Sequence, residues 1–168
     1  MAGREPRRTH SLTASGAWLE PEEGDALRVL ARQLAAETDT SALLQILCES
    51  GAAQCGATGA AVLRAVAREA EVVAASGELT SVRTHRFALP AALAREVLRT
   101  RDVVAVESFS GSEKPLQRVA PALRIGPMLL GPLIAHDTVL GVIAVTRDVG
   151  DRPFAARDIH RIRAISDY

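Results

Sequence analysis

The sequence contains little cysteine, and its two cysteines lack the spacing of a metal or redox pair. Cys48 and Cys55 lie in or just after one predicted helix. On a helix this spacing separates their Cα atoms by about 10 Å, whereas a disulfide requires about 7 Å or less. Neither a CxxC motif nor a nearby histidine supports metal binding. We therefore predict that both cysteines are reduced, buried packing residues.

Long apolar runs and a net charge are also lacking. No run approaches the roughly 20 apolar residues that a membrane span needs, and residues 1–18 do not resemble a signal peptide. Twenty basic residues balance twenty acidic ones, so no positive field would concentrate nucleic acid or an anionic membrane. We expect a cytoplasmic segment that has neither a nucleic-acid partner nor a membrane contact.

Motifs of hydrolytic and phosphoryl-transfer enzymes are missing. The chain has no GxSxG, no glycine-rich loop ending in Gly-Lys-Ser/Thr and no HExxH. Without a nucleophile or an acid/base pair in such a motif, we predict no catalytic residues and no enzymatic activity.

What is present is typical of one small globular domain. Its 168 residues are 48% apolar and 24% charged, which is enough of both to fill one core and to cover it. We predict a disordered N-terminal tail over residues 1–20 and a single domain over residues 21–168. The final helix ends without a glycine, asparagine or proline, which indicates a truncated helix that once continued into a linker.

Helical and strand patterns follow one another along the domain. Pro21 starts a helix with an apolar stripe, the polar segment 38–41 breaks it, and Gly56 caps a second helix. Further elements are expected as strands over 60–66 and 72–75, an edge strand ending near Phe87, a helix over 91–100 with Leu93, Val97 and Leu98 on one side, a strand over 103–106 and a short helix over 114–123.

The segment from Met128 to Val145 predicts a β-hairpin. Two apolar runs, 128–135 and 139–145, flank a turn at 136–138. The runs are too continuous for a sheet face in water, so helices should cover at least part of both faces. Pro132 cannot donate a ladder hydrogen bond, which predicts a bulge or a sheet edge there.

This order of elements resembles the GAF domain, and the residues that carry the resemblance lie at its end. They are Pro132 in the first hairpin strand, Leu140-Gly141-Val142 in the second, Phe154 in the following loop and Asp158 at the start of the last helix. The resemblance implies an α+β fold with a central antiparallel sheet of about six strands. It also implies helices packed on one face and a pocket-forming loop and helix region on the other, as in GAF and PAS domains.

Cofactors of relatives find little support in this chain. Bilin-binding relatives, and the related free methionine sulfoxide reductases, use cysteines that residues 56–168 lack. Haem-binding relatives use a histidine, but His85, His136 and His160 are isolated candidates. Cyclic-nucleotide-binding relatives carry an Asn-Lys pair where this chain has Thr146-Arg147. We expect no cofactor and no metal.

A pocket for a small molecule is predicted between Val106 and Met128. Phe109, Leu123 and Met128 would form apolar walls, and Arg118 and Arg124 would supply cations, which suits a weakly polar or anionic ligand. The alternative is that the apolar residues fill the core and both arginines point to water.

For function, the resemblance implies a non-catalytic input domain that senses a signal. It would bind an unknown small molecule, or relay a signal, and act on an output domain such as the kinase of a two-component system. The alternative is a ligand-free dimerisation and relay module of the same fold. Ile159, Ile162 and Ile165 form an apolar stripe on the last helix, which predicts a parallel homodimer through the first and last helices. The stripe could instead be consumed by the domain's own sheet.

Overall fold

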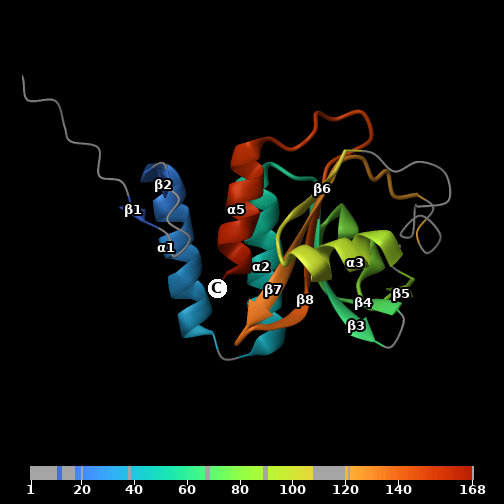
Figure 1. Cartoon of the computed structure of the whole chain (residues 1–168), viewed down its shortest axis with the longest axis horizontal. Coiled ribbons are helices and arrows are strands. Elements are labelled where there is room, and N and C mark those ends of the chain that lie inside the picture. Colours follow the sequence, from blue (N-terminus) through green and yellow to red (C-terminus); the bar gives the residue numbers. More distant parts are fainter. Residues whose placement is uncertain are drawn as a thin grey trace, which may run out of the picture.

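A computed structural model describes residues 11–12, 18–19, 21–37, 39–66, 69–88, 91–107, 120 and 122–167. Figure 1 shows a twisted sheet with helices on either side. The described elements are β1 (Ser11–Leu12), β2 (Trp18–Leu19), α1 (Pro21–Ala36), α2 (Thr40–Cys55), β3 (Gly59–Val66), β4 (Glu69–Gly77), the 3-10 helix η1 (Glu78–Val82), β5 (Arg86–Phe87), α3 (Ala91–Thr100), β6 (Val104–Val106), β7 (Met128–Ala135), β8 (Thr138–Thr146) and α5 (Ala156–Ser166).

Six strands form one antiparallel sheet in the order β5-β4-β3-β8-β7-β6. The predicted hairpin is present as β7 and β8. Its turn is shorter than predicted, because Thr138 already pairs with Ala135. His136 and Asp137 alone make the turn, with φ of 47° and 62°. Positive φ at both turn residues matches the right-handed twist of the paired strands.

Pro132 occupies a position where the sheet tolerates a missing N–H. β6 pairs with β7 only as far as Leu130, so Pro132 has no described strand partner on that side. A bulge then interrupts the β7–β8 register between Leu133 and Ile134. Both features that the proline predicts, an edge and a bulge, therefore occur beside it.

Local chemistry sets the limits of α2. The Asp39 carboxylate accepts a hydrogen bond from the Ser41 N–H at 2.9 Å, which caps the first turn. At the other end Gly56 adopts a left-handed conformation with φ of 56°, and its N–H donates back to the helix. The predicted break near residues 38–41 and the predicted glycine cap are both confirmed.

Two apolar layers lie on opposite faces of the sheet. One contains α1, α2 and α5 and is centred on Leu129, Ile143 and Ile162. The other is covered by η1, α3 and residues 123–125, and is centred on Val72, Val82 and Leu130. In Figure 1, α1, α2 and α5 stand side by side, while α3 lies across the sheet from them. The predicted α+β fold with six antiparallel strands is confirmed.

Some features differ from the sequence-based expectation. Leu98 was expected to share the apolar side of its helix with Val97, but it is 58% exposed while Val97 is buried. β1 and β2 pair with each other inside the predicted tail; its remaining residues lie outside the described part, so their disorder stays a prediction. Most of the predicted 114–123 helix also lies outside it. Among the described helices, none is both long and apolar enough to cross a membrane.

Candidate functional site

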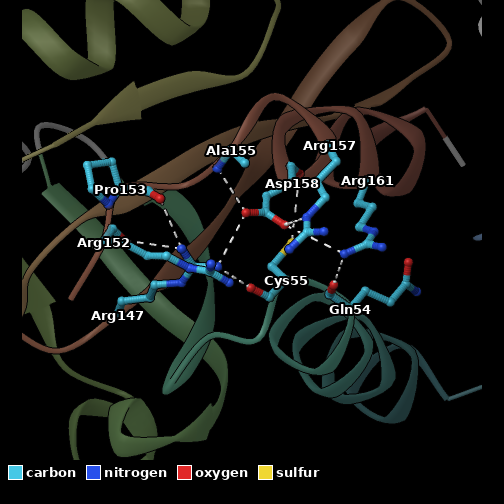
Figure 2. Close-up of polar contacts among 9 residues, drawn as sticks. All are labelled: Gln54, Cys55, Arg147, Arg152, Pro153, Ala155, Arg157, Asp158 and Arg161. Atoms are coloured by element: carbon cyan, nitrogen blue, oxygen red, sulfur yellow. Dashed lines mark hydrogen bonds and ion pairs between the residues drawn. The ribbon is translucent and has the colours of Figure 1, made fainter.

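A buried ion pair joins the end of the sheet to the start of the last helix. Arg147 follows β8, and Asp158 lies in the first turn of α5. The Arg147 Nη2 lies 3.3 Å from the Asp158 Oδ2, and the two side chains are only 7% and 3% exposed. Charged side chains at this depth need both an opposite charge and hydrogen bonds. Figure 2 shows how the surrounding groups supply them.

The Arg147 guanidinium donates to three backbone carbonyls. Its Nη1 reaches the carbonyls of Arg152 and Pro153, each at 3.1 Å, and its Nη2 reaches that of Cys55 at 2.7 Å. The guanidinium carbon also lies 4.1 Å from the centre of the Phe154 ring, a cation–π contact. One arginine thus holds the 152–154 loop and the end of α2 against the last sheet strand.

Asp158 organises the beginning of α5. Its Oδ2 accepts the N–H of Ala155, the residue before the helix, at 2.9 Å. Arg161 lies 3.6 Å from Oδ1 of Asp158 and donates to the Gln54 carbonyl at 2.7 Å. The sequence placed Asp158 at the start of the last helix, which is where it lies, but its burial beside Arg147 was not predicted. No local signal in the sequence marks Arg147 as buried, because its carbonyl partners come from the end of α2 and from the 152–153 loop.

A second ion pair ties the far end of α5 to the junction of α3 and β6. Arg163 makes a two-pronged contact with Asp102, with Nε–Oδ1 and Nη2–Oδ2 distances of 2.7 and 2.8 Å. These hydrogen bonds lower the pKa of the Asp102 carboxyl below its usual value. Asp102 also accepts the Val103 N–H at 2.7 Å, which fixes it at the start of β6.

Neither cysteine is suited to nucleophilic chemistry. Both are free and buried, as predicted. Burial raises the pKa of Cys48 and of Cys55 to about 12, so the reactive thiolate is scarce near neutral pH. No group of three or more potential metal-binding side chains occurs within the described residues.

Only part of the predicted ligand site can be located. Leu123 and Met128 are buried in the core on the α3 side of the sheet, and both belong to one apolar cluster. Arg124 is 70% exposed and pairs with Asp148 at 3.2 Å, beside that cluster. Phe109 and Arg118 lie outside the described residues. Whether these five residues bind a ligand stays a prediction.

The family assignment rests on a match that covers most of the chain. The family model described as the GAF domain matches residues 39–168. This chain belongs to the GAF domain family. The match includes the complete six-stranded sheet and both members of each ion pair.

Solved GAF domains share this fold at low sequence identity. The GAF domain from an Acinetobacter phosphoenolpyruvate-protein phosphotransferase has a TM-score of 0.71 and 15% identity, over 88% of this chain and 90% of that one. The GAF-B domain of DevS from Mycobacterium smegmatis has a TM-score of 0.62 and 25% identity, over 77% and 88%. The chromophore-binding domain of Stigmatella aurantiaca phytochrome P1 has a TM-score of 0.68 and 14% identity, and this chain spans 58% of it. No curated protein matches the sequence.

We expect Phe154→Ala to destabilise this GAF domain moderately, by about 1–3 kcal/mol. Phe154 is half-buried, against the α5 side of the core. The loss combines part of its apolar burial with the contact to Arg147. Urea unfolding measures the change, and Phe154→Leu should retain more stability than Phe154→Ala. An unfolding midpoint equal to wild type would show that the 152–154 loop does not pack on the domain.

Proposed function

We propose that this GAF domain is a non-catalytic, signal-sensing input module that passes its signal through α5 to an output domain, such as a histidine kinase of a two-component system. One observation carries the proposal: ion pairs hold α5 at both ends. Asp158 in its first turn pairs with Arg147, which follows β8, and Arg163 in its last turn pairs with Asp102 on the α3 side. A change on either side of the sheet therefore has a direct mechanical connection to α5.

The Asp102–Arg163 pair marks the route from the predicted pocket to α5. Asp102 lies between α3 and β6, and β6 leads into the 106–128 segment where the sequence predicts a ligand. A shift of β6 would change the position of Asp102 and pull or release Arg163. One structurally similar GAF domain comes from a phosphotransferase, and a similar chromophore-binding domain comes from a phytochrome, which supports a regulatory role for this one.

A retained ligand is the direct test of sensing. The whole chain, purified from the cells that express it, would be measured by native mass spectrometry and by absorption spectroscopy. Hydrogen exchange would then be compared before and after the ligand is removed by unfolding and refolding. We expect slower exchange in α5 when the ligand is present. If no ligand is retained, and hydrogen exchange in α5 is the same before and after unfolding and refolding, the alternative of a ligand-free relay and dimerisation module is favoured.

We expect the Asp102–Arg163 pair to contribute up to about 1 kcal/mol of coupling energy at neutral pH, since both side chains are partly exposed. Pairing lowers the pKa of Asp102, so this stabilisation is present above the unfolded value of about 3.9 and is lost as pH falls through the lower folded value. A double-mutant cycle of Asp102→Asn and Arg163→Gln, by urea unfolding at pH 7 and pH 3, measures it.

The exposed Asp25–Arg28 pair on α1 is the matched control, because its side chains are 73% and 60% exposed. The same cycle there should give little coupling at either pH. Coupling at Asp102–Arg163 that is no larger than in this control would show that the second tie to α5 is not stable in solution.

A further inference from the structure

An apolar cleft opens between the helices and the sheet, on the face opposite the predicted ligand pocket. Its volume is about 430 Å³, within the range of 300–1,000 Å³ typical of small-molecule sites. It lies where α1 ends, α2 begins and α5 ends, over the hairpin end of the sheet. Its lining residues come from three helices and four strands: Leu34, Thr40, Leu43, Leu44, Leu47, Val62, Val73, Leu133, Ile134, Ala135, Leu140, Gly141, Ile165 and Ser166.

The chemistry of the lining selects against charged ligands. Among the residues that the structure describes, no charged side chain and no aromatic ring lines the cleft. The Ser166 hydroxyl already donates to the Ile162 carbonyl at 2.9 Å, which leaves Thr40 at the start of α2 as the other lining hydroxyl. An anion or a nucleotide would lose its hydration here without gaining partners. A neutral, largely hydrocarbon molecule makes few hydrogen bonds to water, so its transfer into the cleft is favourable.

Two β-bulges shape the floor of the cleft. In β4, Ala74 pairs with Val62 and Val72 pairs with Leu63, so Val73 is the extra residue. In β8, Gly141 pairs with Leu133 and Val139 pairs with Ile134, so Leu140 is extra. Both extra residues line the cleft. Bulges redirect side chains and are common next to functional sites, and here two independent bulges direct side chains to the same space.

The exposure of the lining side chains is typical of a small-molecule pocket and not of a protein-docking face. Its other leucine, isoleucine and valine side chains are buried or half-buried, whereas Leu140 is 62% exposed at the mouth. A docking face for a second copy would present several exposed apolar side chains to solvent. The apolar surface is instead folded inward, between α2 and the sheet.

We propose that this cleft binds a neutral, largely hydrocarbon small molecule, whose presence packs α1 against α2 and α5. The ligand would complete a layer in which α1 is an outer helix (Figure 1). This site goes beyond the proposed signalling function, and binding there does not depend on that function being correct.

The test uses the neutral fluorescent amine N-phenyl-1-naphthylamine with the whole 168-residue chain. We expect saturable binding with one probe per chain and a rise in fluorescence. Leu140→Asp should weaken binding about tenfold or more, because a carboxylate at the mouth must stay hydrated. Val149→Asp is the matched control, since Val149 is 50% exposed but does not line the cleft. Equal affinities of the two variants would overturn the proposal.

A second pair of variants guards against loss of folding, which thermal melts would reveal. Leu44→Trp should fill the cleft and abolish probe binding while the domain stays folded; Leu98→Trp, on exposed α3 surface, should bind as wild type. 1-Decanol should displace the probe and decanoate should not. Equal displacement by decanoate would contradict a neutral ligand.

Two further outcomes would overturn the cleft proposal alone. Light scattering that shows a dimer, disrupted by Leu140→Asp and competing with the probe, would identify a second copy as the occupant. A ligand retained from cells that is insensitive to both Leu140→Asp and Leu44→Trp would lie elsewhere. That result would leave the proposed input function standing while the cleft proposal fails.

Discussion

Asp158→Ala is expected to lower the free energy of unfolding by about 3–5 kcal/mol, a large part of the stability of a domain this size. The substitution leaves the Arg147 guanidinium buried without its counter-charge. It also leaves the Ala155 N–H without the carboxylate that now accepts it. Both losses fall at the junction of sheet, α2 and α5 (Figure 2). Urea unfolding followed by circular dichroism measures the change.

Asp148→Ala is the matched control for this substitution. Asp148 is also an aspartate paired with an arginine, but its partner Arg124 is mostly exposed. Its loss should cost about 1 kcal/mol or less, as for other surface ion pairs. The double variant Arg147→Met/Asp158→Asn should be more stable than the sum of the single changes predicts, because it leaves no unpaired buried charge. An Asp158→Ala variant within 1 kcal/mol of wild type, on the scale of the surface control, would mean that water reaches Arg147.

The elements that could be predicted from sequence are those with local causes. Gly56 ends α2 because the left-handed backbone conformation at a helix end favours glycine. Asp39 begins α2 because its carboxylate caps the first turn. The hairpin is visible as two apolar runs around a short polar turn. In each case the signal and the structure it specifies lie within a few residues of each other.

The buried ion pair could not be predicted in the same way. Nothing local distinguishes Arg147 from an exposed arginine after a strand, because its carbonyl partners come from the end of α2 and from the 152–153 loop. The bulge at Val73 is equally hidden, since apolar residues surround it and alternation does not show which one is extra. Pro132 predicted a bulge near it, but not that Leu140 on the partner strand would be the extra residue. These features depend on how distant segments pack.

The sequence located the apolar stripe of the last helix correctly, but it did not decide whether the stripe packs on the domain's own sheet or on a second copy of the chain. Ile162 and Ile165 are buried by α2 and the sheet, and Ile159 packs against the same core. Leu27 and Leu30 of α1 are buried in that core as well. The homodimer remains a prediction, and it would need surface other than these residues, such as that around Val29, which is 51% exposed.

We expect Ile162→Ala to lower the free energy of unfolding by about 2–5 kcal/mol, the usual range for truncating a buried isoleucine. Ile162 is fully buried and lies over two glycines. A Cβ at position 131 would lie 2.6 Å from its Cγ2, and one at position 51 would lie 3.8 Å from its Cδ1. The backbones of β7 and α2 therefore form the walls of its site, and they cannot easily collapse into the space that the alanine leaves.

The same variant separates the two uses of the stripe. If Ile162 serves the domain core, stability measured by urea unfolding falls at every protein concentration, and the mass measured by light scattering does not change. If it instead serves a dimer, the monomer keeps its stability and the dimer dissociates at higher concentrations than in wild type. Val29→Ala on the exposed side of α1 is the comparison, because it should leave the core intact and weaken only an interface formed there. An unchanged stability of Ile162→Ala together with weaker dimerisation would assign the stripe to a partner chain.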